Sequence, residues 1–144
     1  MLIDFNFEDI TFDTPNLNTI SNWINFVITK ENRFTGNITY IFCSDNYLLD
    51  INKKFLNHNY FTDVITFDYV ENDLISGDIF ISVDRIVENS KTFNVSRETE
   101  FLRVVIHGVL HLLGYNDLTD EDEKVIHQKE DLYISIFESE FKND

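Results

Sequence analysis

The sequence is poor in the residues that cross-link or interrupt a chain. Its 144 residues include one Cys, one Pro and four Gly. A single cysteine excludes an internal disulfide framework and a zinc site of the Cys-x-x-Cys type. So little Pro and Gly is typical of an ordered domain rather than of a disordered or low-complexity chain. The length suits one domain, and we expect residues 1–144 to fold around one hydrophobic core.

Long hydrophobic segments are also missing. No apolar run approaches the roughly 18 residues that a membrane helix needs. The first residues, MLIDFNFEDI, lack the basic segment followed by an apolar one that marks a secretory signal. We therefore expect a cytoplasmic protein that makes no contact with membranes.

Positive charge is scarce. The chain has 11 Lys and Arg against 26 Asp and Glu, which gives a formal net charge of -15. Proteins that bind nucleic acids usually carry a basic face, because neutralisation of phosphates supplies most of their affinity. The composition therefore argues against a simple RNA-coating role. An RNA substrate would have to be contacted locally, through a metal ion or with the help of a partner protein.

Aromatic residues, by contrast, are abundant, and the 14 Phe and 6 Tyr should fill much of the core. Residue periodicity and β-branched content predict strands at 2–12, 38–43, 64–70 and 78–83, and helices at 16–29, about 45–55, 84–93, 97–114 and 119–138. Gly36 is expected in the connection before the second strand. The short connection between the last two strands predicts an antiparallel pair. The pattern as a whole predicts an α+β fold, with one small mixed β-sheet covered by helices.

The most informative segment is residues 98–117, ETEFLRVVIHGVLHLLGYND. His107 and His111 are four residues apart, so in a helix they lie one above the other on the same face. Gly114 then ends the helix and reverses the chain, so that Asp117 can return as a third ligand. Two imidazoles and one carboxylate leave a fourth position open, which is the layout of a catalytic metal site. A zinc ion bound there would activate water and polarise a phosphoryl or carbonyl oxygen.

Other readings of these residues remain open. Two histidines at this spacing also occur without a metal, as hydrogen-bonded residues of a packed helix, although the glycine break and the returning carboxylate favour a metal site. Gly108 stands where metalloproteases of the His-Glu-x-x-His type carry their catalytic Glu, so the sequence lacks a peptidase base. Asp63 and Asp78 begin predicted strands and could either orient a ligating histidine or cap a turn. His58 and His127 are expected on the surface.

The string HGVLHLLGYND resembles the signature of the YbeY family of metal-dependent endoribonucleases, His-Gly-x-Leu-His-Leu-x-Gly-Tyr-Asp-His. Upstream, Asn52 and residues 62–67 (TDVITF) are similar to the family's Asn and Thr-Asp-Val-Leu-Ser-Phe segment, and residues 77–82 (GDIFIS) to its Gly-Asp-Ile-Val-Ile-Ser strand. The resemblance covers the chain from about residue 50 onward. It implies an α+β fold, one zinc ion per chain, and hydrolysis of single-stranded RNA in the maturation of the small-subunit rRNA 3′ end and in ribosome quality control. It also implies two partners, a small-subunit ribosomal protein and an assembly GTPase.

The sequence departs from the family pattern at two positions. Asp117 stands where the family has its third histidine; a carboxylate is an acceptable zinc ligand but makes the metal a weaker Lewis acid, and the alternative is that it does not ligate. Leu56 stands where the family often has an arginine that contacts substrate phosphate. Lys53, Lys54 or Arg103 could substitute for it. Arg103 is the best candidate, because it lies one turn before the first histidine on the same helix face, and its alternative is an ordinary surface salt bridge.

The sequence therefore predicts a zinc-dependent endoribonuclease. His107, His111 and Asp117 are expected to hold the metal, and His107, His111 and Arg103 to take part in catalysis. No residue stands out as the general base. A second hypothesis is a ribosome-assembly factor that contains a structural metal and has lost nuclease activity, as the leucine at position 56 and the acidic charge suggest. A third is a zinc peptidase, which would need a base that the sequence does not provide.

Overall fold

A computed structural model describes residues 2–58 and 62–142 of the chain. Within these residues, one sheet contains the strands β1 (Leu2–Phe7), β2 (Phe34–Cys43), β3 (Val64–Asp68) and β4 (Leu74–Ser82). The helices are α1 (Leu17–Lys30), α2 (Asp45–Leu56), α3 (Val83–Thr92), α4 (Arg97–Leu112) and α5 (Asp120–Ile136), followed by a π-helical turn at Phe137–Phe141. No helix in this part of the chain is long and apolar enough to cross a bilayer.

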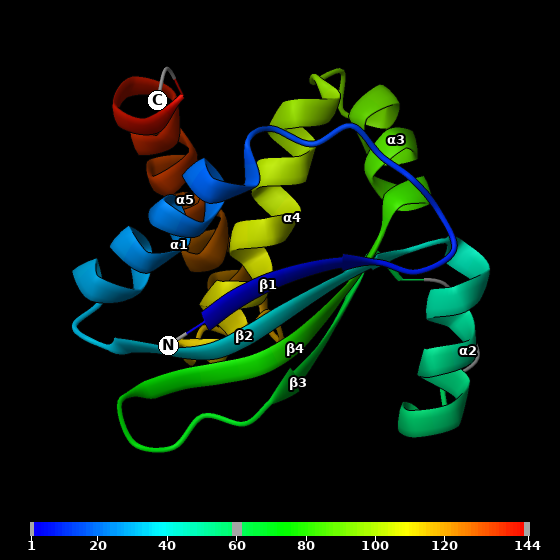
Figure 1. Ribbon diagram of the computed structural model, residues 1–144, viewed down its shortest axis with the longest axis horizontal. Helices are drawn as coiled ribbons and strands as arrows, with labels where there is room; N and C mark the ends of the chain where they lie inside the picture. Colours follow the sequence, from blue (N-terminus) through cyan, green and yellow to red (C-terminus); the bar gives the residue numbers. More distant parts are fainter. Residues whose placement is uncertain (1, 59–61, 143–144) are drawn as a thin grey trace.

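The sheet is mixed, and its strand order is β1-β2-β4-β3. β1 pairs with β2 and β2 with β4 in parallel, whereas β3 pairs with β4 in the antiparallel direction. The predicted antiparallel pair and the predicted α+β class are therefore confirmed. β3 lies at one edge of the sheet, so one side of its backbone has no strand neighbour among the described residues (Figure 1).

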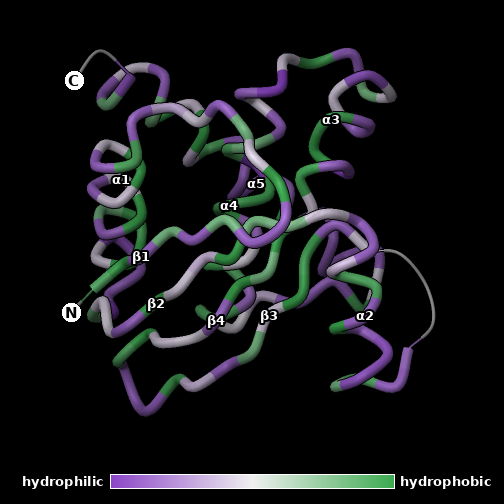
Figure 2. Tube along the Cα trace, turned by 45° about the vertical axis from the view of Figure 1, so that its right-hand side comes forward, coloured by the Kyte–Doolittle hydropathy of each residue, from purple (hydrophilic) through white to green (hydrophobic). Residues whose placement is uncertain are grey.

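Helices cover the two faces of the sheet unequally. Figure 1 shows α1, α4 and α5 together on one face, where they enclose the main hydrophobic core with β2 and β4. The side of α1 that faces the molecule is hydrophobic and its outer side is hydrophilic (Figure 2). On the other face α2 covers only a small cluster around Cys43, Leu48 and Ile65. The main core thus lies beneath α4, the helix that carries both candidate histidines.

Glycine lets α4 pack very closely on the sheet. A Cβ atom on Gly108 would lie 2.7 Å from Cγ2 of Ile79 in β4, and one on Gly77 would lie 2.8 Å from Cδ2 of Leu112 in α4. The hydroxyl of Tyr40 in β2 also donates a hydrogen bond to the carbonyl of Val105 at 2.9 Å. Because this face of α4 is held against β4, the neighbouring face, which carries the histidines, looks toward β3 at the sheet edge.

Several element boundaries differ from the predictions. β1 ends at Phe7 rather than at residue 12, because its partner β2 ends at Cys43 and the next residue caps α2, which leaves no strand for residues 8–12 to pair with. Gly36 lies inside β2, next to a register shift, where a Cβ atom would be 2.1 Å from Oγ of Ser76. The predicted last helix at 119–138 gives way to the π-helical turn after residue 136.

Candidate metal centre

The end of α4 is shaped by a glycine turn. Gly114 has φ of +104°, its N–H donates to the carbonyl of His111, and the N–H of Tyr115 donates to the carbonyl of Leu110. These two bonds form a Schellman motif, which closes a helix and reverses the chain. The chain is thereby turned back along α4, and Asp117 lies beside the end of that helix, as the sequence predicted.

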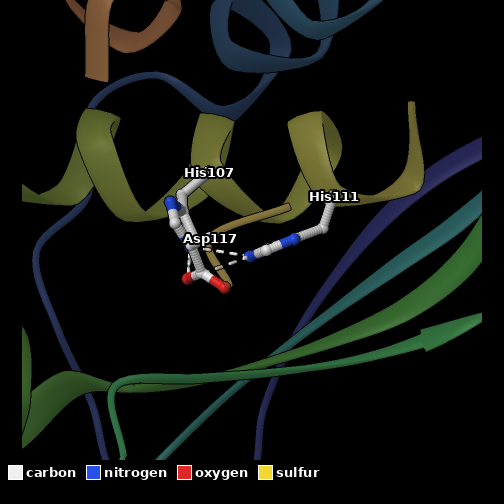
Figure 3. Close-up of side chains that lie close together, drawn as sticks. All are labelled: His107, His111 and Asp117. Atoms are coloured by element: carbon white, nitrogen blue, oxygen red, sulfur yellow. Dashed lines mark hydrogen bonds and ion pairs between the residues drawn. The ribbon is translucent and has the colours of Figure 1, made fainter. Parts of the chain in front are cut away.

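Three side-chain donor atoms converge at this point. The Nε2 atoms of His107 and His111 are 2.9 Å apart, and Oδ2 of Asp117 is 3.7 Å from each of them. Figure 3 shows both imidazoles extending from α4 toward the carboxylate, with strands passing beneath. Ligands about 2.0 Å from one zinc ion in a tetrahedron are about 3.3 Å from each other. The observed separations bracket that value, so the donor set fits a single ion.

The second nitrogen of each imidazole has a partner that can only accept a hydrogen bond. Nδ1 of His107 is 2.6 Å from a carboxylate oxygen of Glu130, and Nδ1 of His111 is 3.0 Å from the carbonyl oxygen of Tyr115. Both Nδ1 atoms therefore donate, which leaves the Nε2 lone pairs directed at the common point. This is the arrangement by which proteins orient metal-binding histidines.

The two imidazoles have pKa values shifted in opposite directions. Burial acts to lower the pKa of His107, but the hydrogen bond and the charge of Glu130 outweigh it, so that pKa is raised. For His111, burial and the neighbouring His107 lower the pKa below its usual value. The lowered pKa favours the neutral form of His111, which is the form that binds a metal.

Glu130 is a site residue that the sequence analysis missed. Its side chain is 1% exposed, and besides His107 it accepts hydrogen bonds from Arg103 at 2.9 Å and from His127 at 3.1 Å. Burial alone would raise the pKa of Glu130, but the bonds from His107 and Arg103 lower it, so the carboxylate is charged. A signal was present in the sequence, because Glu130 stands at helical spacing from the apolar residues Ile126, Tyr133 and Phe137. A charged residue in such a position needs a partner.

An open cleft of about 520 Å³ runs from these residues along the free edge of β3. Its lining residues come from α2, β3, α4 and the segments beside them: Asn52, Leu56, His58, Thr62, Asp63, Val64, Ile65, Thr66, Asp68, His107, His111 and Asp117. Among the described residues that line it, there is no Lys or Arg. Leu56, where the family pattern often has arginine, thus lies in the cleft, and no other described cation takes that place.

Arg103 lies behind the histidines rather than in the cleft. Its guanidinium forms ion pairs with Glu130 and Asp131, each at 2.9 Å. It lines a smaller cavity of about 210 Å³ on the far side of His107. Arg103 thus forms one ion pair at the surface, with Asp131, and one with the buried carboxylate of Glu130, which is also the partner of His107.

The remaining sequence candidates separate into near and distant ones. Asp63 lines both the cleft and the smaller cavity, whereas Asp78 lies in the middle of β4, accepts a hydrogen bond from Tyr69 at 3.1 Å and lines neither. The expectation that Asp78 starts a strand near the metal is wrong, because β4 begins four residues earlier, at Leu74. His58 and His127 are exposed, as predicted; His58 lines the cleft, and His127 contacts Glu130. Lys53 and Lys54 are exposed on α2 and do not line the cleft.

These features define a class of protein, a small α+β fold with a candidate single-metal site on a helix and the turn after it, beside an open cleft. Comparison of the sequence with known families identifies the protein more narrowly. The family model described as Endoribonuclease YbeY matches residues 3–138, and the chain belongs to that family. The resemblance found in the motifs is thus confirmed and extends over nearly the whole chain.

Individual relatives agree with this assignment. The chain is 49% identical to the Endoribonuclease YbeY of Flavobacterium psychrophilum over 136 residues, which cover 94% of this chain and 96% of the relative. It is 40% identical to the Endoribonuclease YbeY of Parabacteroides distasonis, with 97% and 99% covered. The solution structure of a Thermotoga maritima protein is similar, with a TM-score of 0.66, 27% identity, and 99% and 96% of the two chains covered.

Proposed function

We propose that this protein is a zinc-dependent endoribonuclease that cleaves single-stranded RNA, with His107, His111 and Asp117 as the metal ligands. Family membership makes it an endoribonuclease, a hydrolase of RNA phosphodiester bonds. The observation that carries the metal assignment is the convergence of two Nε2 atoms and one carboxylate oxygen, with both Nδ1 atoms held by acceptors. The chemistry of this donor set, nitrogen and oxygen with an open fourth position, is that of catalytic zinc.

A zinc ion in this site would supply Lewis acidity and activate water for attack on a phosphodiester. The chain's own residues orient the ligands: Glu130 holds the ring of His107, the Tyr115 carbonyl holds the ring of His111, and the Gly114 turn presents Asp117. The cleft along β3 leads a strand of RNA to these ligands. An unpaired strand suits such a cleft, because its flexible backbone can bend to bring one phosphate to the ligands.

Arg103 remains part of the proposal with a different task from the one expected. Its two ion pairs engage the guanidinium, and one of them is with the carboxylate that holds His107. These contacts support a role in fixing Glu130 rather than in binding substrate phosphate. In the cleft itself no Lys or Arg is found among the described lining residues, which supports phosphate recognition through the metal or through a partner.

The proposed biological substrate is the 3′ region of small-subunit rRNA, met in the cytoplasm during ribosome maturation and quality control. This part of the proposal is carried by the family's motifs in the chain. We propose a small-subunit ribosomal protein and an assembly GTPase as partners. The net charge of -15 supports docking to a basic ribosomal protein, because opposite charges steer association.

The first experiment measures metal by mass spectrometry in the purified protein and in Asp117→Ala. We expect about one zinc per chain in the wild type and a loss of most of it in the variant. Asp78→Ala is the matched control, because its carboxylate lies outside the cleft. Zinc retained by Asp117→Ala would show that Asp117 is not a ligand. Cleavage of single-stranded against double-stranded RNA then tests the activity, which His111→Ala should abolish.

A second candidate function is a metal-containing assembly factor without nuclease activity. The observation that favours it is Leu56 in a cleft without a described Lys or Arg lining residue. Zinc-loaded protein that cleaves no RNA, together with impaired ribosome assembly in cells carrying the ligand variant His111→Ala, would select this function over the first. A zinc peptidase is disfavoured further, since Ile79 leaves no room at position 108 even for a Cβ atom, and hence none for a glutamate.

A further inference from the structure

A carboxylate outside the cleft holds together three segments around the candidate metal centre. Glu31, at the end of α1, is 13% exposed at its side chain. Its Oε1 accepts a hydrogen bond from the hydroxyl of Tyr115 at 2.6 Å, and its Oε2 accepts from the hydroxyl of Tyr133 and from Nζ of Lys129, the latter at 3.1 Å. Lys129 also lies over the rings of both tyrosines, 5.8 and 5.9 Å from their centroids. We call these four residues the Glu31 cluster.

The cluster meets the metal ligands through one residue. Tyr115 follows the glycine that closes α4, so its backbone N–H is bonded to Leu110 and its carbonyl accepts from Nδ1 of His111 at 3.0 Å. Its hydroxyl is bonded to Glu31. Tyr115 is thus held at its backbone by α4 and at its side-chain tip by α1 and α5. Asp117 follows only two residues later on the same turn.

The charge of Glu31 suits this anchoring task. Burial alone would raise its pKa, but hydrogen bonds from the two tyrosines and from Lys129 lower it, so the carboxylate accepts all three bonds in its charged form. Charge-assisted hydrogen bonds of this kind are stronger than those between neutral groups. None of the four residues lines the cleft along β3, so the cluster does not touch a substrate there.

We propose that Glu31, acting through Tyr115, is a positioning residue of the metal centre: it sets the direction of the His111 ring and the place of Asp117. The inference rests on the proposed zinc site. Residues that orient metal ligands typically change metal affinity about 10–100-fold when altered. Loss of the Glu31 bond would remove one of the two anchors of Tyr115, so that its carbonyl would direct the His111 ring less firmly.

The test compares Tyr115→Phe, which removes only the hydroxyl and keeps the backbone carbonyl, with Glu31→Gln, which removes the charge. Tyr69→Phe is the matched control, because it removes another tyrosine hydroxyl bonded to a carboxylate, that of Asp78, outside the cleft. Zinc dissociation constants are measured by competition with a coloured chelator. Visible spectra of the cobalt-substituted proteins report ligand arrangement independently of activity. All measurements are made where the metal-free variants are fully folded.

Zinc binding weaker by about tenfold or more in Tyr115→Phe and Glu31→Gln, with an altered cobalt spectrum and an unchanged control, is the expected result. If both variants bind zinc within twofold of the wild type and keep its cobalt spectrum, the cluster serves folding only and the proposal is wrong. In that case the zinc site itself still stands. A wild-type protein that binds no zinc would instead overturn both the proposed function and this inference. Should Glu31→Gln fail to fold, Tyr115→Phe decides alone.

Discussion

At the scale of single residues, α4 and α5 each bury one glutamate, and the two glutamates have pKa values shifted in opposite directions. Glu100 and Glu130 are 3% and 1% exposed. Glu130 has three hydrogen-bonding neighbours and a lowered pKa. Burial raises the pKa of Glu100 to about 7, and the hydrogen bond from Asn89 and the charge of Arg103 only partly oppose this. One carboxylate therefore holds His107, a candidate metal ligand, in its charged form, and the other weakens the fold when it ionises.

Glu100→Gln should stabilise the protein in a pH-dependent way. Folding raises the pKa of the Glu100 carboxyl from 4.5 to about 7. The carboxyl therefore costs the folded state no stability below about pH 4.5, where it is protonated in both states. As the pH rises to about 7, the cost in free energy of unfolding grows to its full size. At about pH 8 we expect Glu100→Gln to raise the free energy of unfolding of the metal-free protein by about 1–3 kcal/mol. Urea unfolding of both proteins at about pH 4.5 and pH 8 measures this. A gain of equal size at both pH values would contradict the assignment.

Glu130→Gln should weaken zinc binding while preserving the shape of the side chain. The neutral amide is a poorer acceptor for Nδ1–H of His107, so the ring becomes a less basic ligand, and affinity should fall about 10–100-fold. Glu138→Gln is the control, because Glu138 pairs with Lys142 on the surface, at 3.1 Å. Chelator competition provides the measurement. Equal zinc affinities for the two variants would mean that Glu130 serves only to hold Arg103.

At the scale of elements, asparagine occupies the positions of positive φ in the turns, where glycine is often found. The described non-glycine residues with positive φ are Asn32, Asn57, Asn72 and Asn94. Asn tolerates this backbone region better than other side chains do, because it can hydrogen-bond locally. The chain can therefore make its turns with only four glycines. At Gly36, Gly77 and Gly108 the packing leaves no space for a Cβ atom, so these three glycines serve close approach.

Gly114 is the exception, because its surroundings are open and its φ is +104°. Gly114→Ala should therefore act through backbone strain alone and lower the free energy of unfolding by about 1–2 kcal/mol. Zinc affinity should fall as well, since the turn carries Asp117. Gly114→Asn should have a smaller effect on both, for the reason seen at the four asparagines. Chemical denaturation and zinc titration of both variants test this, and an Ala variant as stable as the wild type would refute the strain argument.

Element types followed well from local periodicity, because alternation and helical spacing are properties of neighbouring residues. The helix at 97–114 was predicted close to its observed range, and the antiparallel pairing of the last two strands was predicted correctly, although β4 begins four residues earlier than expected. The first strand was predicted too long, since its end depends on where β2 stops. Gly36 was assigned to a connection, because a glycine inside a strand is explained only by the close approach of Ser76 from β4.

At the scale of the whole molecule, the acidic net charge should determine how the binding of RNA depends on salt. With a net charge of -15 and a cleft in which no described lining residue is Lys or Arg, the protein repels a polyanion at long range. Salt shortens the reach of that repulsion, from about 30 Å at 0.01 M to about 8 Å at 0.15 M. Most RNA-binding proteins lose affinity over the same range, because released counterions drive their binding.

We therefore expect the apparent KM for a short single-stranded RNA to fall, or to stay level, as potassium chloride rises from about 0.01 to 0.15 M at constant free zinc. Initial cleavage rates over a series of RNA concentrations provide the measurement. An uncharged oligonucleotide analogue as competitor is the control, since its inhibition should not depend on salt. A steep rise of KM with salt would instead mean that several phosphates are neutralised by basic residues.

The sequence by itself determined the local part of the candidate site. The spacing of His107 and His111 on one helix and the Gly114 turn that returns Asp117 depend on residues within eleven positions of one another, where helix geometry alone decides which atoms meet. Only the tertiary structure decided what surrounds them. Glu130 comes from a helix 23 residues beyond His107, Glu31 lies 84 residues before Tyr115, and Leu56 lines the same cleft as the candidate ligands. Such contacts depend on how helices pack on the sheet, which no local period encodes.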